Sequence, residues 1–589
     1  MGQCVDLDDQ IGYTRRMSFI LQRILITSLL STFAMAGTPV IRSITIDGNA
    51  AVSSREILEC LSSRPLLSFS DTMLDADCKT VTAKYRDLGY LGARVWIDTS
   101  RDADDVDLRV SVEENIPTVM GEIILEGNIH LPTEEILPLF TLRPGDPMNE
   151  SVLEADLSSL LGQYEQHGFP LASCALSSMV IRPAERKSIM DITIAIEEGR
   201  RMVIDEVRVE GNTETDASVV VRETRISEGE LFNPARVNQI QKRLIRLNIF
   251  AAVEEPELYF HNEKGGLIIR VQEGNTNTFD GIVGYVPDAS SGYVTGMASV
   301  SMRNVFGTGR KLAFRWQRED RFSQELELHY QEPWVFALPL NVGGGFLQRQ
   351  QDTSYVRNAL EIKSELMLTD EFSAALKFTS ATVIPAARAD PTQFPRSSTS
   401  SLGGELVLDT RNSVASPSAG ARYQTGYDYG RKTQQGPSAR LESQVQRFTL
   451  DLESFFQVLN GQVVAAALHG REVRSGQLEE SDMFRFGGLR TLRGFREGQF
   501  LGSRLAWSNL EYRFLVSRES FFSGFIDLGY YSRPSEEIRK TTGAEVFTYG
   551  YGIGVQVESG LGLLSVSFAL GQRDSFTQGK IHFGIVNDF

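Results

Sequence analysis

The chain has 589 residues, of which 41% are hydrophobic and 23% are charged. This length and balance suit several folded domains and exclude a disordered chain or a bundle of membrane helices. The formal net charge is −17. Because contacts to phosphates need a surplus of Lys and Arg, we expect no nucleic-acid partner.

The first 36 residues are typical of a secretory signal peptide. Basic residues precede an apolar run over 24–33, and Ala34-Met35-Ala36 follows as a small-residue cleavage site. The run of about 10 residues is too short for a membrane-spanning helix, which needs about 20. Acidic residues close to Met1 are unusual in such a signal, so Met17 is an alternative start.

A threefold repeat follows the signal. Three alternating strands each stop at an acidic residue followed by the turn-forming pair Gly-Asn. These pairs are Gly48-Asn49, Gly127-Asn128 and Gly211-Asn212. After each pair come two stretches of helical periodicity and two further strands. The spacing of about 80 residues allows one small core per repeat, so we predict three β-α-α-β-β domains with helices on one face of each sheet.

Three cysteines lie after the expected cleavage site: Cys60, Cys78 and Cys174. Cys60 and Cys78 fall on the two predicted helices of the first repeat, in a compartment that permits disulfides. A Cys60–Cys78 bridge and a pair of buried thiols are both consistent with this placement. Cys174 is left over in either case.

The pattern of apolar and polar residues changes near Thr276. Helical periodicity disappears, and about 16 alternating segments follow, separated by turn-forming residues. The segment 547–557 shows the pattern most clearly, with aromatic and aliphatic residues on one face and Gly, Thr and Gln on the other. A soluble sandwich would turn its apolar face inward. Long strands, the export signal and a terminal Phe589 instead favour a transmembrane antiparallel barrel with a wet interior.

Enzyme chemistry has little support in the sequence. Neither His-Glu-x-x-His nor Gly-x-Ser-x-Gly occurs, and no Cys-x-x-Cys pair or His/Cys spacing fits a metal site. We therefore expect no catalytic residue, no metal and no cofactor.

The tandem of repeats and barrel resembles a known family. Domains of β-α-α-β-β order with Gly-Asn after the first strand look like POTRA domains, and their union with a C-terminal barrel is similar to the BamA/TamA superfamily of outer-membrane assembly and translocation proteins. The family's Arg-Gly-Phe/Tyr loop motif stands here as Arg493-Gly494-Phe495, and its Phe-x-Asp strand motif as 525–527. Phe589 matches the aromatic terminus that is recognised during barrel insertion.

The resemblance sets the expected domains and a loop site. We assign the signal peptide to 1–36, POTRA repeats to 39–116, 117–200 and 201–275, and the barrel to 276–589. The family's loop folds back into the barrel and carries Arg493. Strand alternation turns Asp527 and Glu511 toward the lumen. We predict that Arg493 pairs with Asp527, with Glu511 as a second carboxylate within reach, because a guanidinium can grip a carboxylate bidentately.

The resemblance also implies a location and a function. The barrel would lie in the lipids of the bacterial outer membrane, with the N-terminal domains in the periplasm. Unfolded barrel or autotransporter clients would pair with POTRA sheet edges by β-augmentation. A weak seam between the first barrel strand, near 279–285, and the last, 580–589, would open sideways toward them. A periplasmic or inner-membrane accessory protein is a further candidate partner.

A polypeptide export pore dedicated to one secreted partner is the alternative function. Relatives of that kind usually carry two POTRA repeats and a plug helix, whereas this sequence has three repeats and no room for that helix before the first strand. Three repeats resemble the TamA type, so we favour assembly. A passive porin is disfavoured because diffusion needs no periplasmic arm.

Overall fold

The computed structural model describes residues 39–102, 105–261, 264–286, 293–387, 389–390, 394–414, 416–436, 439–535, 542–559 and 562–586. The expected signal peptide over 1–36, the alternative start at Met17 and the terminal Phe589 lie outside these residues. The chain divides after Met202 into two compact units. Within the described ranges, no helix is both long and apolar enough to cross a bilayer.

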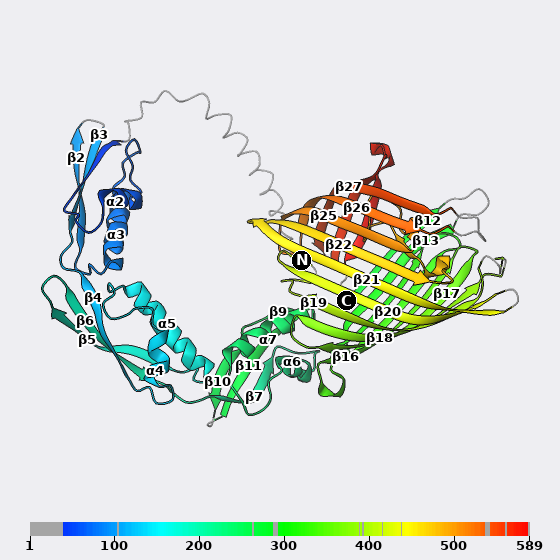
Figure 1. Ribbon diagram of the computed structural model, residues 1–589, viewed down its shortest axis with the longest axis horizontal. Helices are drawn as coiled ribbons and strands as arrows, with labels where there is room; N and C mark the ends of the chain where they lie inside the picture. The colour runs from blue at the N-terminus through cyan, green and yellow to red at the C-terminus, as the bar shows by residue number, and fades with distance from the viewer. Residues whose placement is uncertain are drawn as a thin grey trace, which may run out of the picture. The chain divides into compact units, whose positions relative to one another are not determined.

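The first unit holds two repeats of the expected β-α-α-β-β order (Figure 1). The first consists of β1 (Val40–Asp47), α2 (Ser54–Cys60), α3 (Asp71–Asp87), β2 (Arg94–Asp102) and β3 (Asp105–Glu113). The second consists of β4 (Thr118–Glu126), α4 (Thr133–Ile136), the 3-10 turn η1 (Leu137–Leu139), α5 (Glu150–Gln166), β5 (Ser173–Pro183) and β6 (Ser188–Glu197). In each sheet the last strand lies in the middle, parallel to the first strand and antiparallel to the other.

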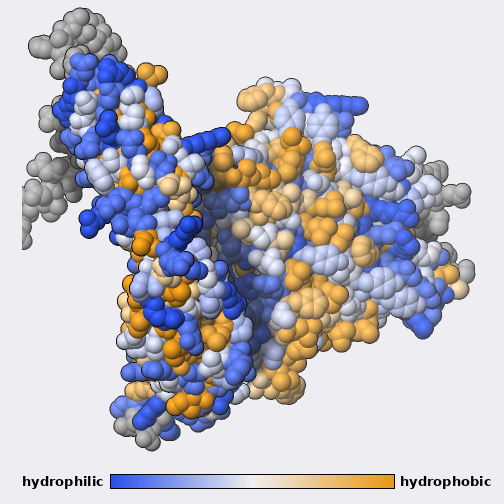
Figure 2. All heavy atoms as spheres, turned by 60° about the vertical axis from the view of Figure 1, so that its left-hand side comes forward, coloured by the Kyte–Doolittle hydropathy of each residue, from blue (hydrophilic) through white to orange (hydrophobic). Residues whose placement is uncertain are grey.

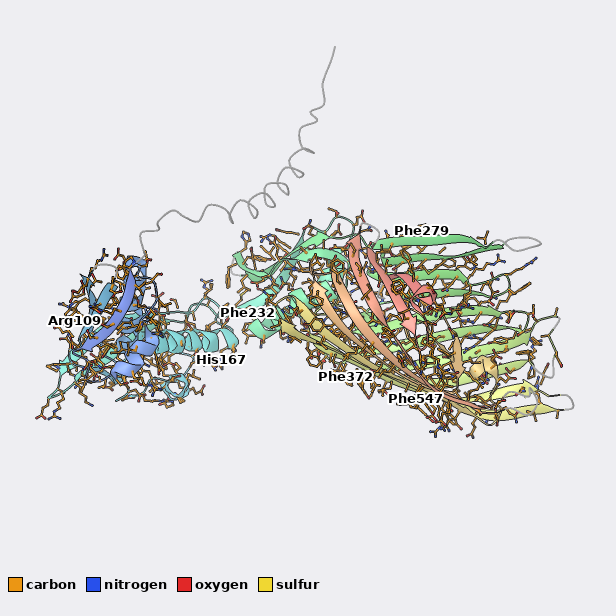
Figure 3. The ribbon with its side chains drawn as sticks, turned by 90° about the horizontal axis from the view of Figure 1, so that it is seen from above. Arg109, His167, Phe232, Phe279, Phe372 and Phe547 are labelled. Atoms are coloured by element: carbon orange, nitrogen blue, oxygen red, sulfur yellow. The ribbon has the colours of Figure 1, made fainter. Side chains whose placement is uncertain are left out.

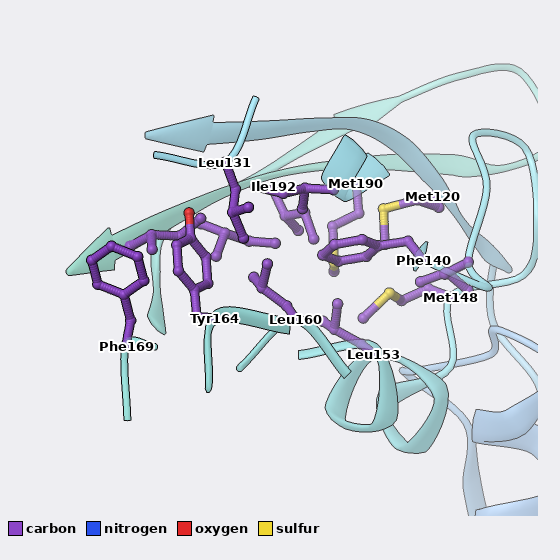
Figure 4. Packing of buried hydrophobic residues seen from close by; sticks show 14 residues of the cluster. Met120, Leu131, Phe140, Met148, Leu153, Leu160, Tyr164, Phe169, Met190 and Ile192 are labelled. Atoms are coloured by element: carbon purple, nitrogen blue, oxygen red, sulfur yellow. The ribbon is translucent and has the colours of Figure 1, made fainter. Parts of the chain in front are cut away.

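Each repeat has its own apolar core between sheet and helices. In the second repeat, alternation along β6 turns Ile192, Ile194 and Ile196 toward α5. Leu160 and Tyr164 of α5 pack against them, and Figure 4 labels both together with Ile192. All five are at most 4% exposed. Burying each such side chain contributes about 1.5–3 kcal/mol, so this small domain is stabilised mainly by one contiguous cluster.

The second unit begins with the third repeat. It consists of β7 (Val203–Glu210), α6 (Ala217–Thr224), β8 (Glu230–Leu231), α7 (Pro234–Arg246), β9 (Phe250–Val253), β10 (Glu257–His261) and β11 (Lys264–Glu273). The sheet order is β10-β11-β7-β8, and β9 pairs with β11. The three predicted POTRA-like folds are therefore confirmed, and β8 and β9 are short additions to the third.

A sixteen-stranded antiparallel sheet follows and curves into a barrel wall (Figure 1). Its strands, in order of pairing, are β12 (Asn277–Val286), β13 (Tyr293–Val305), β14 (Arg310–Arg318), β15 (Gln324–Glu332), β16 (Leu340–Gln351), β17 (Tyr355–Met367), β18 (Phe372–Pro385), β19 (Ser397–Asp409), β20 (Gly420–Gln435), β21 (Arg440–Leu459), β22 (Gln462–Ser475), β25 (Arg504–Leu515), β26 (Phe521–Arg533), β27 (Ala544–Ser559), β28 (Gly562–Gly571) and β29 (Lys580–Val586). The prediction of about 16 strands is confirmed.

The outer side of this wall is apolar. Phe279 of β12 and Phe547 of β27 are 69% and 77% exposed, and Figure 3 labels both on their strands. Figure 2 shows hydrophobic residues spread over the outer surface of the barrel. Neighbours of Phe547 with opposite parity, such as Thr548, are buried toward the interior. This distribution fits a wall in contact with lipid.

The structure distinguishes the two alternatives for the cysteines. Cys60, Cys78 and Cys174 are free, partly buried thiols, so the Cys60–Cys78 bridge is not formed. The residue of α3 that reaches the end of α2 is Asp77, which accepts hydrogen bonds from the amides of Ser62 and Ser63. Burial raises the pKa of the Cys78 thiol.

Gly127 occupies a turn that needs glycine. Its φ is +87°, and an added Cβ would lie 2.2 Å from the carbonyl oxygen of Ile196. Gly127→Ala should therefore destabilise the second repeat by about 2 kcal/mol. Gly162→Ala, on α5 with no atom within 4 Å of the added Cβ, is the matched control and should be neutral or stabilising. Urea-dependent proteolysis of the full-length protein compares them, and equal midpoints would contradict the expectation.

Candidate functional site

A long segment between β22 and β25 folds back against the inner wall of the barrel. It contains the short hairpin β23 (Phe484–Phe486) and β24 (Phe500–Gly502). The side chains of Phe486, Leu492 and Phe495 are at most 9% exposed and pack with Leu505 and Trp507 of β25. A segment with this much buried apolar surface has a fixed position inside the barrel. We call it the inner loop (residues 476–503).

Arg493 joins the inner loop to two carboxylates of the wall. Its Nε and Nη2 donate to the two oxygens of Asp527 at 2.8 Å each, and its backbone amide donates to Asp527 at 2.9 Å. Nη1 donates to Glu511 at 2.9 Å, and the guanidinium lies 3.4 Å from the ring centroid of Phe525. The structure thus brings together Arg493, Asp527 and Glu511 in a bidentate, desolvated arrangement.

The free-energy cost of breaking this ion cluster depends on how deeply its members are buried. Asp527 is fully buried, and Arg493 is 8% exposed. A buried ion pair is costly to break, because removing one partner leaves an uncompensated charge in a medium of low polarity. The neighbouring motif residue Gly494 has φ +91°, and a Cβ there would lie 2.6 Å from the backbone carbon of Leu570. Glycine is needed at this position because the loop backbone touches β28 directly.

The structure adds an anchor that the sequence analysis did not find. Lys432 of β20 has no exposed side-chain surface, and its Nζ donates to Glu479 and Asp482 at the start of the inner loop. Ser397 of β19 also donates to Glu479, at 3.0 Å. Buried ion pairs therefore hold the loop at two places, on β20 and on β25–β26. The only sequence signal was a lysine at an inward position of a predicted strand.

The two ends of the barrel sheet remain separate within the described residues. β12 pairs with β13 and β29 pairs with β28, and no pairing joins β12 to β29 in that part of the chain. In the described part of the chain, β29 pairs with β28 over 580–586. Strand edges in a bilayer lack water as a substitute partner for their backbone groups.

Each POTRA-like repeat closes its Gly-Asn turn in the same way. The Asn side chain donates to a carbonyl three residues later. A glutamate at the end of the last strand, or just after it, accepts from backbone amides of the turn, two in each of the first two repeats and three in the third. The asparagines are Asn49, Asn128 and Asn212, and the glutamates are Glu114, Glu198 and Glu273. The predicted turns thus tie the first strand of each repeat to the end of its last strand.

The third of these turns should respond to acid. Burial alone would raise the pKa of Glu273, but hydrogen bonds from Thr213, Glu214 and Thr215 lower it to about 2. A lowered pKa stabilises the fold above the ordinary value near 4.5, and this stabilisation is lost as the pH falls toward 2. Glu273→Gln should flatten that part of the stability profile. Proteolysis of the third repeat at pH 3 and pH 6 measures it, and an unchanged profile would contradict the expectation.

The third repeat is bound to three turns at one end of the barrel. Arg222 donates to the carbonyl of Thr308, and the indole of Trp334 donates to Glu223 at 2.7 Å. Arg243 reaches Asp370 at 2.7 Å. Burial raises the pKa of Glu223, against the opposing effect of Trp334 and three nearby arginines.

No metal centre emerges from the part of the chain that the structure describes. Among those residues, no group of three or more His, Cys, Asp or Glu side chains could hold an ion. The charged residues Glu479, Asp482 and Arg493 of the inner loop instead pair with charged residues of the barrel wall.

Both parts of the chain match known domains. The Omp85 superfamily domain matches residues 304–589. The POTRA domain, described as the surface antigen variable number repeat, matches residues 39–115, 118–199 and 202–274. This chain belongs to the Omp85 superfamily. It is an outer-membrane protein whose POTRA repeats lie in the periplasm.

Individual relatives agree with this assignment. The chain is 28% identical over 285 residues to the outer membrane protein assembly factor BamA of Nitratidesulfovibrio vulgaris, and 26% identical over 321 residues to BamA of Neisseria meningitidis serogroup B. The matches cover 46% and 51% of this chain but 35% and 39% of those proteins, so it spans well under half of their length. BamA of Haemophilus ducreyi lacking POTRA domains 1–3 has a similar fold, with TM-score 0.50, 18% identity, and coverage of 79% and 98% of the two chains.

Proposed function

We propose that this Omp85 protein assembles or translocates other outer-membrane proteins, receiving client strands first at a POTRA sheet edge and then at the barrel seam. The observation that carries the proposal is the unpaired pair of edges, β12 and β29, within the described residues. An unfolded client strand would satisfy their backbone groups and gain hydrogen bonds that water cannot provide in the bilayer. Client folding would then supply the driving force.

The second POTRA repeat has the most suitable edge. β5 is an outer strand of eleven residues, and it carries no charge before Arg182. Met179, Val180 and Ile181 along it are 51–59% exposed. By contrast, β2 of the first repeat carries four charged residues, and β10 of the third has only five residues. A long, uncharged and apolar edge favours pairing with another strand, whereas charges discourage it.

Charging this edge should weaken client binding. Met179→Lys places an ammonium group on the exposed apolar side of β5 and should lower the affinity for an unfolded barrel segment about tenfold. Lys187→Met, in the turn after β5, is the matched control and should leave affinity within about twofold. Fluorescence anisotropy with a labelled C-terminal barrel peptide measures both variants of the full-length protein. Unchanged binding by Met179→Lys would remove β5 from the proposal.

An accessory partner fits best at the apolar turn of the first repeat. In the second repeat, the turn at Gly145-Asp146 lies beside the preceding domain, where Asn149 reaches the carbonyl of Asp87. The first repeat has Leu66-Leu67 in the equivalent turn, with φ +74° and 86% exposure at Leu66. Terminal repeats normally end in a polar face. We propose that a periplasmic protein covers this apolar turn, and Leu66→Asp should abolish its cross-linking.

A dedicated export pore is the competing function. Depletion of this protein followed by quantitative proteomics of isolated outer membranes separates the two. A joint loss of many unrelated barrels supports assembly. Loss of a single secreted protein with unchanged barrel levels would replace assembly by export.

A further inference from the structure

The inner loop rests in a trough of glycines on the last three strands. A Cβ at Gly550 of β27 would lie 1.9 Å from the carbonyl oxygen of Arg493. At Gly571 of β28 it would lie 2.9 Å from the oxygen of Gly494, and at Gly584 of β29 it would lie 2.3 Å from Leu489. The backbone of the Arg-Gly-Phe motif therefore lies directly against the wall that leads to the seam.

One polar contact joins the motif to the seam strand itself. The backbone amide of Gly494 donates to Nε2 of His582 on β29, at 3.1 Å. Within the described residues β29 has one neighbouring strand, β28. A hydrogen bond from the inner loop therefore adds an independent connection to a strand that is otherwise held along one edge. The same loop is fixed through Arg493 to β25 and β26.

We propose that the inner loop is a latch on the seam, with His582 as the positioning residue through which the loop holds β29 in the sheet. When the motif sits in the trough, β29 is held by β28 on one edge and by the loop from inside. When the motif leaves the trough, only the pairing with β28 holds β29, and β29 separates from the sheet more often. The consequence for clients rests on the proposed function, whereas the latch itself is a property of the empty barrel.

Substitutions at two positions test the latch by different routes. His582→Ala removes the acceptor of the Gly494 amide, and His582→Gln places an amide oxygen near the former position of Nε2. Gly550→Ala instead forces the loop backbone out of the trough. Gly524→Ala of β26, where an added Cβ meets nothing within 4 Å, is the matched control for glycine loss in a barrel strand.

Amide hydrogen exchange of the full-length protein in lipid discs is the measurement. His582→Ala should speed exchange across β29 by about fivefold, the effect of one lost hydrogen bond. Gly550→Ala should do the same, whereas exchange in β20 and β21 should stay unchanged in both. His582→Gln and Gly524→Ala should behave like the unaltered protein. The latch would be overturned if amides of β29 in His582→Ala exchanged at the wild-type rate. It would also be overturned if His582→Gln accelerated exchange in β29 as much as His582→Ala does.

Client insertion into vesicles separates this inference from the proposed function. Faster exchange in β29 together with altered insertion supports both. Faster exchange with unaltered insertion supports the latch and contradicts the use of the seam by clients.

Discussion

Replacing Arg493 with alanine should release the inner loop and abolish client insertion. The substitution leaves the fully buried carboxylate of Asp527 without its two guanidinium hydrogen bonds, and it leaves Glu511 without one. Breaking a buried ion pair in this way costs about 3–5 kcal/mol. The motif should therefore leave its position in the barrel, because staying there would keep the Asp527 carboxylate buried without its counter-charge.

Three variants make this expectation specific. Arg493→Lys keeps the charge but cannot grip Asp527 bidentately, so it should recover little insertion. Asp527→Asn should resemble Arg493→Ala, because it removes the matching charge from the wall. Arg490→Ala removes an exposed arginine of the same loop and serves as the control. Insertion of a model barrel protein into vesicles is measured beside the melting temperature of the barrel. Normal insertion by both Arg493→Ala and Asp527→Asn would sink the proposed role.

The inward positions of these residues were predictable from local pattern. Strand alternation has a period of two, so Asp527 and Glu511 fall on the lumen side once the lipid side is recognised. The resemblance of the loop to the family's Arg-Gly-Phe motif then identified Arg493 as the partner of these two carboxylates. Alternation says only that a residue faces inward, however, and it does not say which strand lies opposite. Lys432 and His582 were missed for that reason, since their loop partners lie 47 and 88 residues away in sequence.

The POTRA turns show the same limit at short range. Gly-Asn pairs mark a turn because glycine adopts φ near +85° there. Nothing in the local pattern reveals that the glutamate at the end of the last strand, or just after it, closes each turn. That contact depends on parallel pairing of the first and last strands, which brings residues such as Ala50 and Glu114 together across 64 positions. The Cys60–Cys78 alternative failed similarly, because helical periodicity could not show that Asp77 faces the end of α2.

Replacing Asp370 with alanine should loosen the third POTRA repeat from the barrel. Its carboxylate is shared by Arg243 at 2.7 Å and Arg225 at 3.2 Å, and its backbone oxygen accepts from Arg246. The side chains of Asp370, Arg225 and Arg243 are 20%, 21% and 10% exposed, so salt screens them only partly. Losing the charged hydrogen bonds should cost about 2 kcal/mol, or roughly 30-fold in the equilibrium between docked and released repeat.

A change in mobility rather than in folding is the expected readout, because the third repeat keeps its own sheet and helices in this variant. Spin labels on α7 and on β18, in a background without Cys60, Cys78 and Cys174, report the distance between repeat and barrel. The distribution should broaden in Asp370→Ala and stay narrow in Glu371→Ala, which removes an exposed carboxylate from the same turn. Trp334 and Glu223 hold a second turn, so Asp370→Ala combined with Trp334→Ala should broaden it further. Equal distributions in Asp370→Ala and Glu371→Ala would show that backbone contacts alone dock the repeat.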